Sequence, residues 1–440
     1  MDYYKLLTSV DDYEKICICI NDKIYTYNDV INDSIKLEES IKENMNISDK
    51  EIVAIFNENL YFQLISFFAL NKAKMVPLII HPSTPYKEVE EIMKVNRIKY
   101  ILDSRGIKKI YLDKNEKLFN LSNCTNAVLT SGSTGLPKVL LRTYESWAGF
   151  FENQNEVFSV NNNTILFFHG PLSFTGNLNS ILSVIYEGGT LVTYEGFNPL
   201  MWQRLIRKCN VNTMYMVPAK IIALNKSLKE PIKSIKSIFT GSQQLFGNLK
   251  FEMKKYYSNA SIILYYGASE LNYITYINLD ELIKNPLSVG KPFKGVKVKI
   301  KDEYIYVMSN YFVQGFKGWC SVKDKGYISK NGELIFNGRE EEIINKGGNT
   351  INLKRILSKI RKLSYINNAF VTSYNDQSKE KEIVAFIETN KYITKFQFKK
   401  DLKDELLTYE MPKKIFILDK IPLNDSGKIN KRELKFKFNI

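Results

Sequence analysis

Short apolar runs rich in valine and isoleucine alternate with longer helical patterns, and this alternation limits the possible folds more than any other feature. EIVAIF (51–56), MVPLII (75–80) and IKYILD (98–103) have the length and composition of buried strands. The segments between them, LYFQLISFFALNKA (60–73) and PYKEVEEIMKVN (85–96), read as helices. Strand–helix–strand alternation implies parallel sheets with crossover helices, so we predict an α/β fold.

The same alternation predicts a division into two parts. Apolar strands recur near TILFF, TLVTY, TMYMV, SIFTG and SIILYYG, with no internal repeat or low-complexity segment. We therefore expect residues 1–340 to form a large N-terminal body of mostly parallel sheets with flanking helices. Residues 341–440 read in order as helix, strand, strand, helix and strand (353–363, 368–374, 382–388, 395–407 and 414–418). That content is enough for a small α+β domain.

The small number of histidines and the spacing of the cysteines argue against several kinds of site. His81 and His169 are the only histidines, which disfavours a Ser-His-Asp triad and a zinc site built from histidine. The five cysteines form no CxxC pair, and their odd number does not suggest a disulfide framework.

The formal net charge of +15 does not by itself indicate a nucleic-acid partner. Basic residues are interleaved with acidic ones, as in KSLKEPIKSIKS, and no nucleic-acid-binding motif accompanies them. We expect no nucleic-acid role and some attraction for anionic ligands such as nucleotides. The first residues lack the pattern of a signal peptide, and the longest apolar stretch, LYFQLISFFAL, is too short to span a bilayer. We expect a cytoplasmic protein without stable membrane insertion.

The segment LTSGSTGLPK (129–138) concentrates small, polar and basic residues after a predicted strand. Such a loop presents backbone N–H groups to phosphate oxygens, and the mobile lysine charge can follow a phosphate. It is not the common P-loop, because Lys138 lies between Pro137 and Val139. A Gly/Ser/Thr cluster alone is usually a surface turn. The full order T-S-G-S-T-G-x-P-K is far more specific.

This segment resembles the phosphate-binding loop of the adenylate-forming (AMP-binding) superfamily, which includes acyl-CoA synthetases, adenylation domains of peptide synthetases and luciferases. Further segments resemble other motifs of that superfamily in the same order. They are FTGSQQL (239–245), YYGASE (265–270), SVGKPFKGVKVKI (288–300), the run 318–351 and PLNDSGKINKREL (422–434). The resemblance covers nearly the whole chain and is closest in look to bacterial acyl-CoA synthetases.

The resemblance implies a reaction that joins a carboxylate to the α-phosphate of ATP and releases pyrophosphate. Four residues would act in the chemistry: Glu270 as the ligand of Mg²⁺, Lys428 as a bridge between the carboxylate and the α-phosphate, and Thr134 and Ser269 near the phosphates. The phosphates of ATP would be held by the loop residues Thr130, Ser131, Gly132, Ser133, Thr134, Gly135 and Lys138.

The same resemblance assigns residues to the adenosine and to the acid. Tyr266 would lie against the adenine ring, and Asp324 and Arg339 would bind the ribose. The remaining nucleotide contacts would come from Gly241, Ser242, Gly267, Ala268 and Ser269. The acid would contact His169, Phe174, Gly241 and Gly267.

A mobile C-terminal domain is also implied, with its hinge at Glu341. After adenylation this domain would rotate, and Gly347 and Gly348 would line a narrow channel for a pantetheine thiol. The thiol would belong to CoA or to a phosphopantetheinyl carrier protein, and the motifs do not decide between them.

Three positions depart from the usual pattern of the superfamily. Val139 follows the lysine of the phosphate loop where relatives have glycine, so either the backbone is extended there or the loop geometry differs. Lys323 precedes the ribose-binding aspartate, and Glu341 replaces the usual Asp or Lys of the hinge.

The acid itself is only partly constrained by the sequence. No acidic residue follows Phe174 to pair with an α-ammonium group, and an unpaired buried ammonium would be costly. A fatty or aryl acid is therefore favoured over an amino acid, with CoA as the expected acceptor. Two alternatives stay open: a stand-alone adenylation enzyme that loads a carrier protein, and a non-catalytic nucleotide-binding descendant.

Overall fold

The structure, a computed structural model, describes most of the 440 residues. The described ranges are 2–44, 50–110, 119–130, 137–241, 245, 248–339, 343–346, 349–375, 381–403, 405–424, 428–438 and 440.

Among the described residues, strands from the N-terminal third of the sequence form a six-stranded sheet. Its strand order is β6-β5-β3-β4-β7-β8. β3 pairs in parallel with β4 and β5, and β4 pairs in parallel with β7. The crossovers are α3 (Leu60–Lys72) and α4 (Tyr86–Val95), so the predicted strand–helix alternation is confirmed here. The strands are β3 (Ile52–Ile55), β4 (Val76–Ile79), β5 (Tyr100–Asp103), β6 (Gly106–Lys109), β7 (Cys124–Thr130) and β8 (Lys138–Thr143).

Within the described ranges, a second sheet contains thirteen strands and has a parallel half and an antiparallel half. The parallel half runs β13-β12-β11-β9-β10-β1, with β2 (Lys23–Thr26) antiparallel at its edge. Its strands are β1 (Ile16–Ile20), β9 (Ile165–Phe168), β10 (Thr190–Thr193), β11 (Thr213–Tyr215), β12 (Ser237–Thr240) and β13 (Ser261–Ala268). The accompanying helices are α1 (Tyr4–Thr8), α2 (Tyr27–Asn44), α5 (Ala148–Phe158), α6 (Thr175–Tyr186), α7 (Pro199–Lys208), α8 (Pro218–Ser227) and α9 (Leu249–Tyr256).

The antiparallel half differs from the expected, mostly parallel arrangement. Short connections join several of its successive strands, and a parallel crossover needs a dozen or more residues. Its elements are β14 (Asn272–Asn278), α10 (Leu279–Lys284), β15 (Ser288–Pro292), β16 (Lys297–Lys301), β17 (Tyr304–Met308), β18 (Asp324–Ile328) and β19 (Leu334–Arg339).

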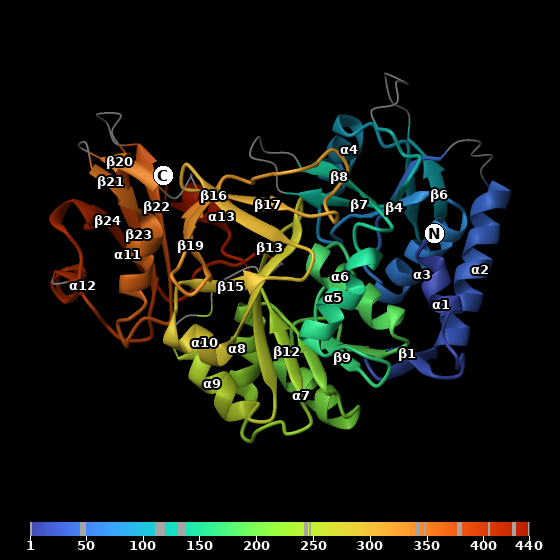
Figure 1. The fold of residues 1–440 in the computed structure, drawn as a ribbon, viewed down its shortest axis with the longest axis horizontal. Helices are drawn as coiled ribbons and strands as arrows, with labels where there is room; N and C mark the ends of the chain where they lie inside the picture. Colours follow the sequence, from blue (N-terminus) through green and yellow to red (C-terminus); the bar gives the residue numbers. More distant parts are fainter. Residues whose placement is uncertain are drawn as a thin grey trace.

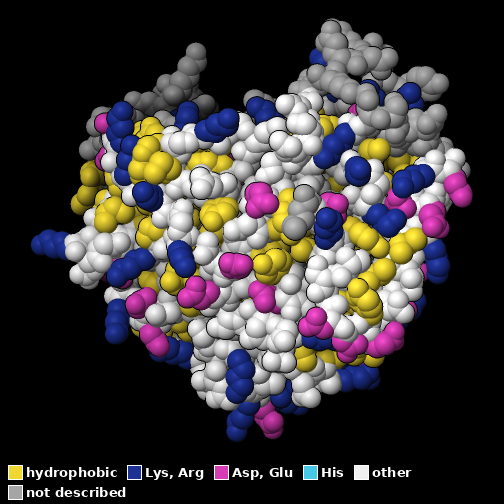
Figure 2. Space-filling model, turned by 45° about the vertical axis from the view of Figure 1, so that its right-hand side comes forward, with side chains coloured by type: hydrophobic (Ala, Val, Ile, Leu, Met, Phe, Trp, Pro, Cys, Tyr) yellow, Lys and Arg dark blue, Asp and Glu magenta, His cyan; other side chains and the backbone are white. Residues whose placement is uncertain are grey.

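Two hydrophobic clusters cover the large sheet. One also reaches the six-stranded sheet, because it contains Val53 of β3, Phe67 of α3, Ile181 of α6 and Leu166 of β9. The other packs residues of α7, α8 and α9 against strands such as β11. Figure 2 shows Lys and Arg side chains interspersed with Asp and Glu over the face in view, as the interleaved sequence predicts.

The C-terminal elements gather at one side of the molecule, opposite α2 and β6 (Figure 1). Two hydrophobic clusters there contain only residues from Ile344 onward. The elements are β20 (Ile343–Lys346), β21 (Asn349–Asn352), α11 (Leu353–Ile360), β22 (Asn368–Asn375), β23 (Lys381–Glu388), α12 (Lys395–Leu402), β24 (Lys414–Leu418) and α13 (Lys431–Lys437). The predicted helix 395–407 is shorter than expected, since α12 ends at Leu402. No helix in the described parts of the chain combines the length and the apolar content that a bilayer crossing requires.

Candidate active site

Several of the predicted site residues follow parallel strands at the same edge of the large sheet. His169 comes directly after β9, Gly241 directly after β12, and Gly267 and Ala268 close β13. In open α/β sheets the carboxyl ends of the strands form the crevice in which ligands bind. The topology therefore brings together segments that are about a hundred residues apart in sequence.

The predicted phosphate loop joins two paired strands of the smaller sheet. Thr130 ends β7, Lys138 begins β8, and the two residues are ladder partners. Ser131, Gly132, Ser133, Thr134 and Gly135 lie outside the described residues. Val139 is buried and pairs with Leu129, and its φ is not positive. The extended alternative for Val139 is therefore the correct one.

The Asn96 side chain, at the end of α4, forms hydrogen bonds with the C-terminal end of this loop. The side chain is 5% exposed, and its Nδ2 donates to the Pro137 carbonyl at 3.1 Å. Its Oδ1 accepts from the Val139 N–H at 3.2 Å. The backbone on both sides of Lys138 is thus held by one buried amide.

Ser269 and Glu270 form the tight turn between β13 and β14, and both are half-buried. The Glu270 carbonyl accepts from the Val313 N–H at 3.1 Å. Gly267 is required just before this turn, because a Cβ there would lie 2.5 Å from the Asn272 carbonyl oxygen. The close packing at Gly267 and the hydrogen bond from Val313 fix the backbone before and within this turn. The predicted magnesium ligand, Glu270, therefore has a defined backbone position at the end of β13.

A buried arginine connects this turn to the strand that follows the phosphate loop. Arg142 lies in β8, and its Nη2 donates to the Ser269 carbonyl at 2.6 Å. Its Nη1 lies 3.4 Å from both the Tyr311 carbonyl and the Ser146 hydroxyl. Burial lowers the pKa of Arg142 to about 10, so the guanidinium is charged at neutral pH.

The residues predicted to bind the adenosine also lie together. The Tyr266 hydroxyl donates to Asp324 Oδ2 at 2.6 Å, and the Tyr266 ring is 5.3 Å from the ring of Phe336. Asp324 is buried at the start of β18, where its ladder partner is Arg339 of β19. Ser242 and the side chain of Arg339 lie outside the described residues.

Two buried tyrosines pack against Gly241 of the predicted acid site and against Gly176 of α6. A Cβ on Gly241 would lie 2.4 Å from the ring of Tyr265, and one on Gly176 would lie 1.9 Å from the Tyr215 hydroxyl. The hydroxyls of Tyr215 and Tyr265 are 3.0 Å apart. The Tyr265 ring therefore covers one side of Gly241. A ligand could contact the Gly241 backbone only on the side that faces away from this ring.

The ring of His169 is used for packing. Its Nε2 lies 3.0 Å from the Gly196 carbonyl and its ring is 4.3 Å from the ring of Trp202. Burial and the nearby Lys220 ammonium lower the pKa of His169 to about 3, so the ring is neutral. Lys220 Nζ donates to the His169 carbonyl at 2.9 Å. These contacts give His169 a structural role, and its contact with the acid stays a prediction.

Phe174 lies at the start of α6, and its ring is 5.2 Å from the ring of His81. A ligand contact of Phe174 also stays a prediction.

Lys428 is exposed in a turn of the C-terminal region. Its N–H donates to Asn424 Oδ1 at 2.9 Å, and its carbonyl accepts from the Asn424 N–H at 2.7 Å. The hinge residue Glu341 and the channel residues Gly347 and Gly348 lie outside the described residues.

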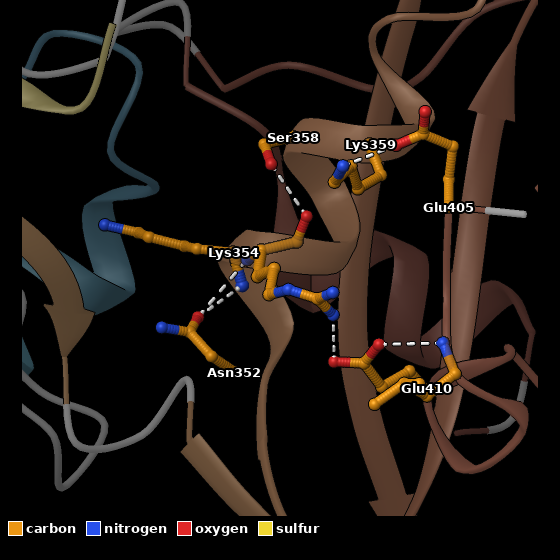
Figure 3. Close-up of polar contacts among 8 residues, drawn as sticks. Asn352, Lys354, Ser358, Lys359, Glu405 and Glu410 are labelled. Carbon is orange, nitrogen blue, oxygen red and sulfur yellow. Dashed lines mark hydrogen bonds and ion pairs between the residues drawn. The ribbon is translucent and has the colours of Figure 1, made fainter. Parts of the chain in front are cut away.

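The first turn of α11 contacts the strand that precedes the predicted hinge. Asn352 caps this helix by accepting from the N–H groups of Lys354 and Arg355, as Figure 3 shows. Its Nδ2 also donates to the Asn337 carbonyl of β19 at 2.7 Å. Lys354 Nζ lies 3.8 Å from the centre of the Phe336 ring, which in turn contacts Tyr266. The C-terminal region therefore contacts the predicted adenosine site.

The carboxylate of Glu270 fits the chemistry of magnesium. Among the residues that the structure describes, no three His, Cys, Asp or Glu side chains gather as a metal cage. Magnesium usually binds one or two carboxylates together with substrate phosphates and water. A single half-buried glutamate, in a turn that Arg142 links to β8, is compatible with that mode of binding.

Two residues of this arrangement belong to none of the predicted motifs. The sequence marks Arg142 only as a charged residue inside the apolar strand VLLRT. Nothing in the sequence marks Asn96 as a residue of the site. Their roles depend on contacts between segments far apart in sequence.

Known proteins share both the sequence family and the fold. The chain matches the family described as AMP-binding enzyme over residues 10–308. VraA of Staphylococcus epidermidis, whose name is that of a long chain fatty acid-CoA ligase, is 26% identical to this chain, with 96% of this chain and 95% of VraA covered. The D-alanine–D-alanyl carrier protein ligase of Lactococcus lactis subsp. lactis is also 26% identical, with 98% of each chain covered.

Among solved structures, o-succinylbenzoate coenzyme A synthetase (MenE) of Bacillus subtilis, in complex with ATP and magnesium ion, is similar with a TM-score of 0.84. The sequence identity is 18%, and 99% of each chain is covered. This likeness shows a shared fold. Because the family match extends over more than half of the sequence, this chain belongs to the AMP-binding enzyme family.

Proposed function

We propose that this enzyme activates a carboxylic acid with ATP and transfers the acyl group to a thiol. In the first step a carboxylate oxygen attacks the α-phosphorus, and the bond to pyrophosphate breaks. In the second step the thiol sulfur attacks the acyl carbon, AMP leaves and the thiol proton is released. Family membership and the ligase names of the relatives support this class of enzyme, an adenylate-forming acid–thiol ligase.

One series of contacts carries the proposal. Arg142 joins the strand that begins at Lys138 to the Ser269–Glu270 turn. Tyr266, on the strand that enters this turn, donates to Asp324. The residues expected at the phosphates, the metal and the ribose are therefore connected, although nearly two hundred positions separate Lys138 from Asp324.

The proposed roles follow from the charge that develops in the reaction. Negative charge moves onto phosphate oxygens, so fixed donors and cations lower the barrier. The N–H groups of the phosphate loop and Lys138 would hold the β- and γ-phosphates. Lys428 would bind the carboxylate and the α-phosphate together, while Asp324 and Arg339 hold the ribose. Glu270 would hold Mg²⁺, which neutralises phosphate charge when it is bound.

A fatty or aryl acid is the proposed substrate. The turn after β9 offers no carboxylate to an amino group, and the side chains beside Gly241 and Phe174 are mainly aromatic. CoA is the proposed acceptor, in line with the name of VraA. The D-alanyl carrier protein ligase keeps a carrier protein as the second candidate.

Residues 341–440 are proposed as the mobile domain. The hydrophobic clusters confined to this region support a separate core. The contacts of Asn352 and Lys354 with β19 would have to change when the domain rotates.

Product analysis tests the proposal. The enzyme is incubated with ATP, Mg²⁺, one acid from a panel of fatty, aryl and amino acids, and either CoA or a phosphopantetheinyl carrier protein. We expect AMP, pyrophosphate and an acyl-CoA with a fatty or aryl acid, detected by mass spectrometry. A thioester formed only on the carrier would select the second candidate. Absence of AMP formation with every acid would refute the function.

A further inference from the structure

Arg142 is a buried cation whose charge has no role in the proposed mechanism. Its side chain is 0% exposed, and it lies four residues after Lys138 in β8. Charged side chains are almost never fully buried unless they are paired, because removing an ion from water costs several kcal/mol. In the described parts of the chain, no carboxylate lies within ion-pair distance of Arg142.

The contacts of Arg142 explain its position but do not neutralise its charge. It donates to the carbonyls of Ser269 and Tyr311 and to the Ser146 hydroxyl, and its guanidinium lies 4.8 Å from the centre of the Trp147 ring. Its Nε has no partner among the described residues. A protein with an apolar side chain of similar volume in such a place is often at least as stable as one with a charge. The presence of a charge at this position therefore suggests that an anionic group binds nearby.

Glu270 directly follows Ser269, whose carbonyl accepts a hydrogen bond from Arg142 at 2.6 Å. The charge of Arg142 therefore lies beside the turn that carries the predicted magnesium ligand, on the strand that follows the predicted phosphate loop. A magnesium–ATP complex carries more negative charge than Glu270 alone, and it would bring that charge to the same place.

We propose that Arg142 is a positioning residue for magnesium–ATP: it fixes the Ser269–Glu270 turn against β8 and offsets the charge of the triphosphate. This inference rests on the proposed function. AMP lacks the β- and γ-phosphates and the magnesium ion, so its binding should depend mainly on Tyr266 and Asp324 and much less on Arg142.

Calorimetric binding separates these two ligands. For Arg142→Lys and Arg142→Met we expect the Kd of magnesium–ATP to rise about 10- to 100-fold, which is the usual effect of losing a residue that orients a metal ligand. The Kd of AMP should stay within about twofold of the wild-type value. An unchanged Kd for magnesium–ATP, or an equal loss for both ligands, would overturn the inference. Should Arg142→Met fail to fold, Arg142→Lys decides.

Arg361→Lys is the matched control. Arg361 is a half-buried arginine whose pKa is likewise lowered to about 10 by desolvation, and its Nη2 donates to the Ala369 carbonyl at 2.9 Å in the C-terminal region. Its substitution should lower the unfolding free energy without changing the ratio of the two Kd values. A wild-type enzyme that binds magnesium–ATP but forms no adenylate with any acid would refute the proposed function and leave the Arg142 inference standing.

Discussion

In the proposed mechanism single side chains supply the charges that adenylate formation needs, and Lys428 can be replaced without opening the core because it is exposed. Lys428→Ala should slow adenylation by about 10²–10³-fold, the effect of removing a preorganised charge from a transition state. Its melting temperature should match that of the wild type. Lys435→Ala, another exposed lysine of the same region, is the control and should keep full activity. Equal activity of the two variants would show that the role of Lys428 is wrong.

His169 should make the stability of the enzyme depend on pH. The pKa of its half-buried ring is lowered to about 3, whereas an unfolded histidine titrates near 6.5. Between these values the unfolded chain binds a proton that the folded chain does not, so stability falls as the pH falls through this window. His169→Gln should lose less unfolding free energy than the wild type between about pH 7 and about pH 4.5, measured by urea denaturation. Identical losses would contradict a half-buried neutral ring.

At the scale of elements, the junction between α4 and β8 holds one end of the phosphate loop. Asn96→Ala leaves the Val139 N–H and the Pro137 carbonyl without this partner, which should cost about 1–3 kcal/mol of stability. The KM for ATP should rise while the KM for the acid stays constant. Asn225→Ala, which removes a buried amide that accepts from Tyr257, should lose similar stability without a change in the KM for ATP.

The secondary structure near the N-terminus could be predicted closely from sequence because periodicity and composition agree there. Strands 51–56 and 75–80 and the helices after them match β3, β4, α3 and α4 to within a few residues. The helix 395–407 was predicted too long, because Leu406 is buried in the same cluster as Phe398 and Leu402 after the helix has ended. Apolar spacing reports burial and cannot distinguish a helix from a turn that packs on the same core.

The residues of the candidate site also differ in how far the sequence alone predicts them. Roles for Glu270, Asp324 and Lys428 can be predicted from motifs because their expected chemistry restricts the residue types at fixed spacing, and these roles stay predictions. Arg142 and Asn96 act through backbone carbonyls and N–H groups on other segments, and any sequence can supply those groups. Their roles become visible only when the fold brings those segments together.

At the scale of the whole molecule, the proposed hinge at Glu341 would separate the two half-reactions. Proline at position 341 would fix φ and restrict rotation of the C-terminal region. Glu341→Pro should therefore adenylate the acid at close to the wild-type rate but form the thioester about 10²-fold more slowly, since a misplaced acceptor channel loses the proximity effect. Single-turnover measurements of each step test this expectation. Glu341→Ala keeps the backbone free and should retain both steps; equal loss in both variants would point to the side chain instead of the rotation.

The exchange of labelled pyrophosphate into ATP tests the first half-reaction directly, without a thiol and without domain rotation. We predict exchange that requires Mg²⁺, depends on a fatty or aryl acid, and slows by about 10²–10³-fold in Lys428→Ala. Exchange that is absent with every acid, in an enzyme that is folded and binds ATP, would contradict adenylate formation by this chain.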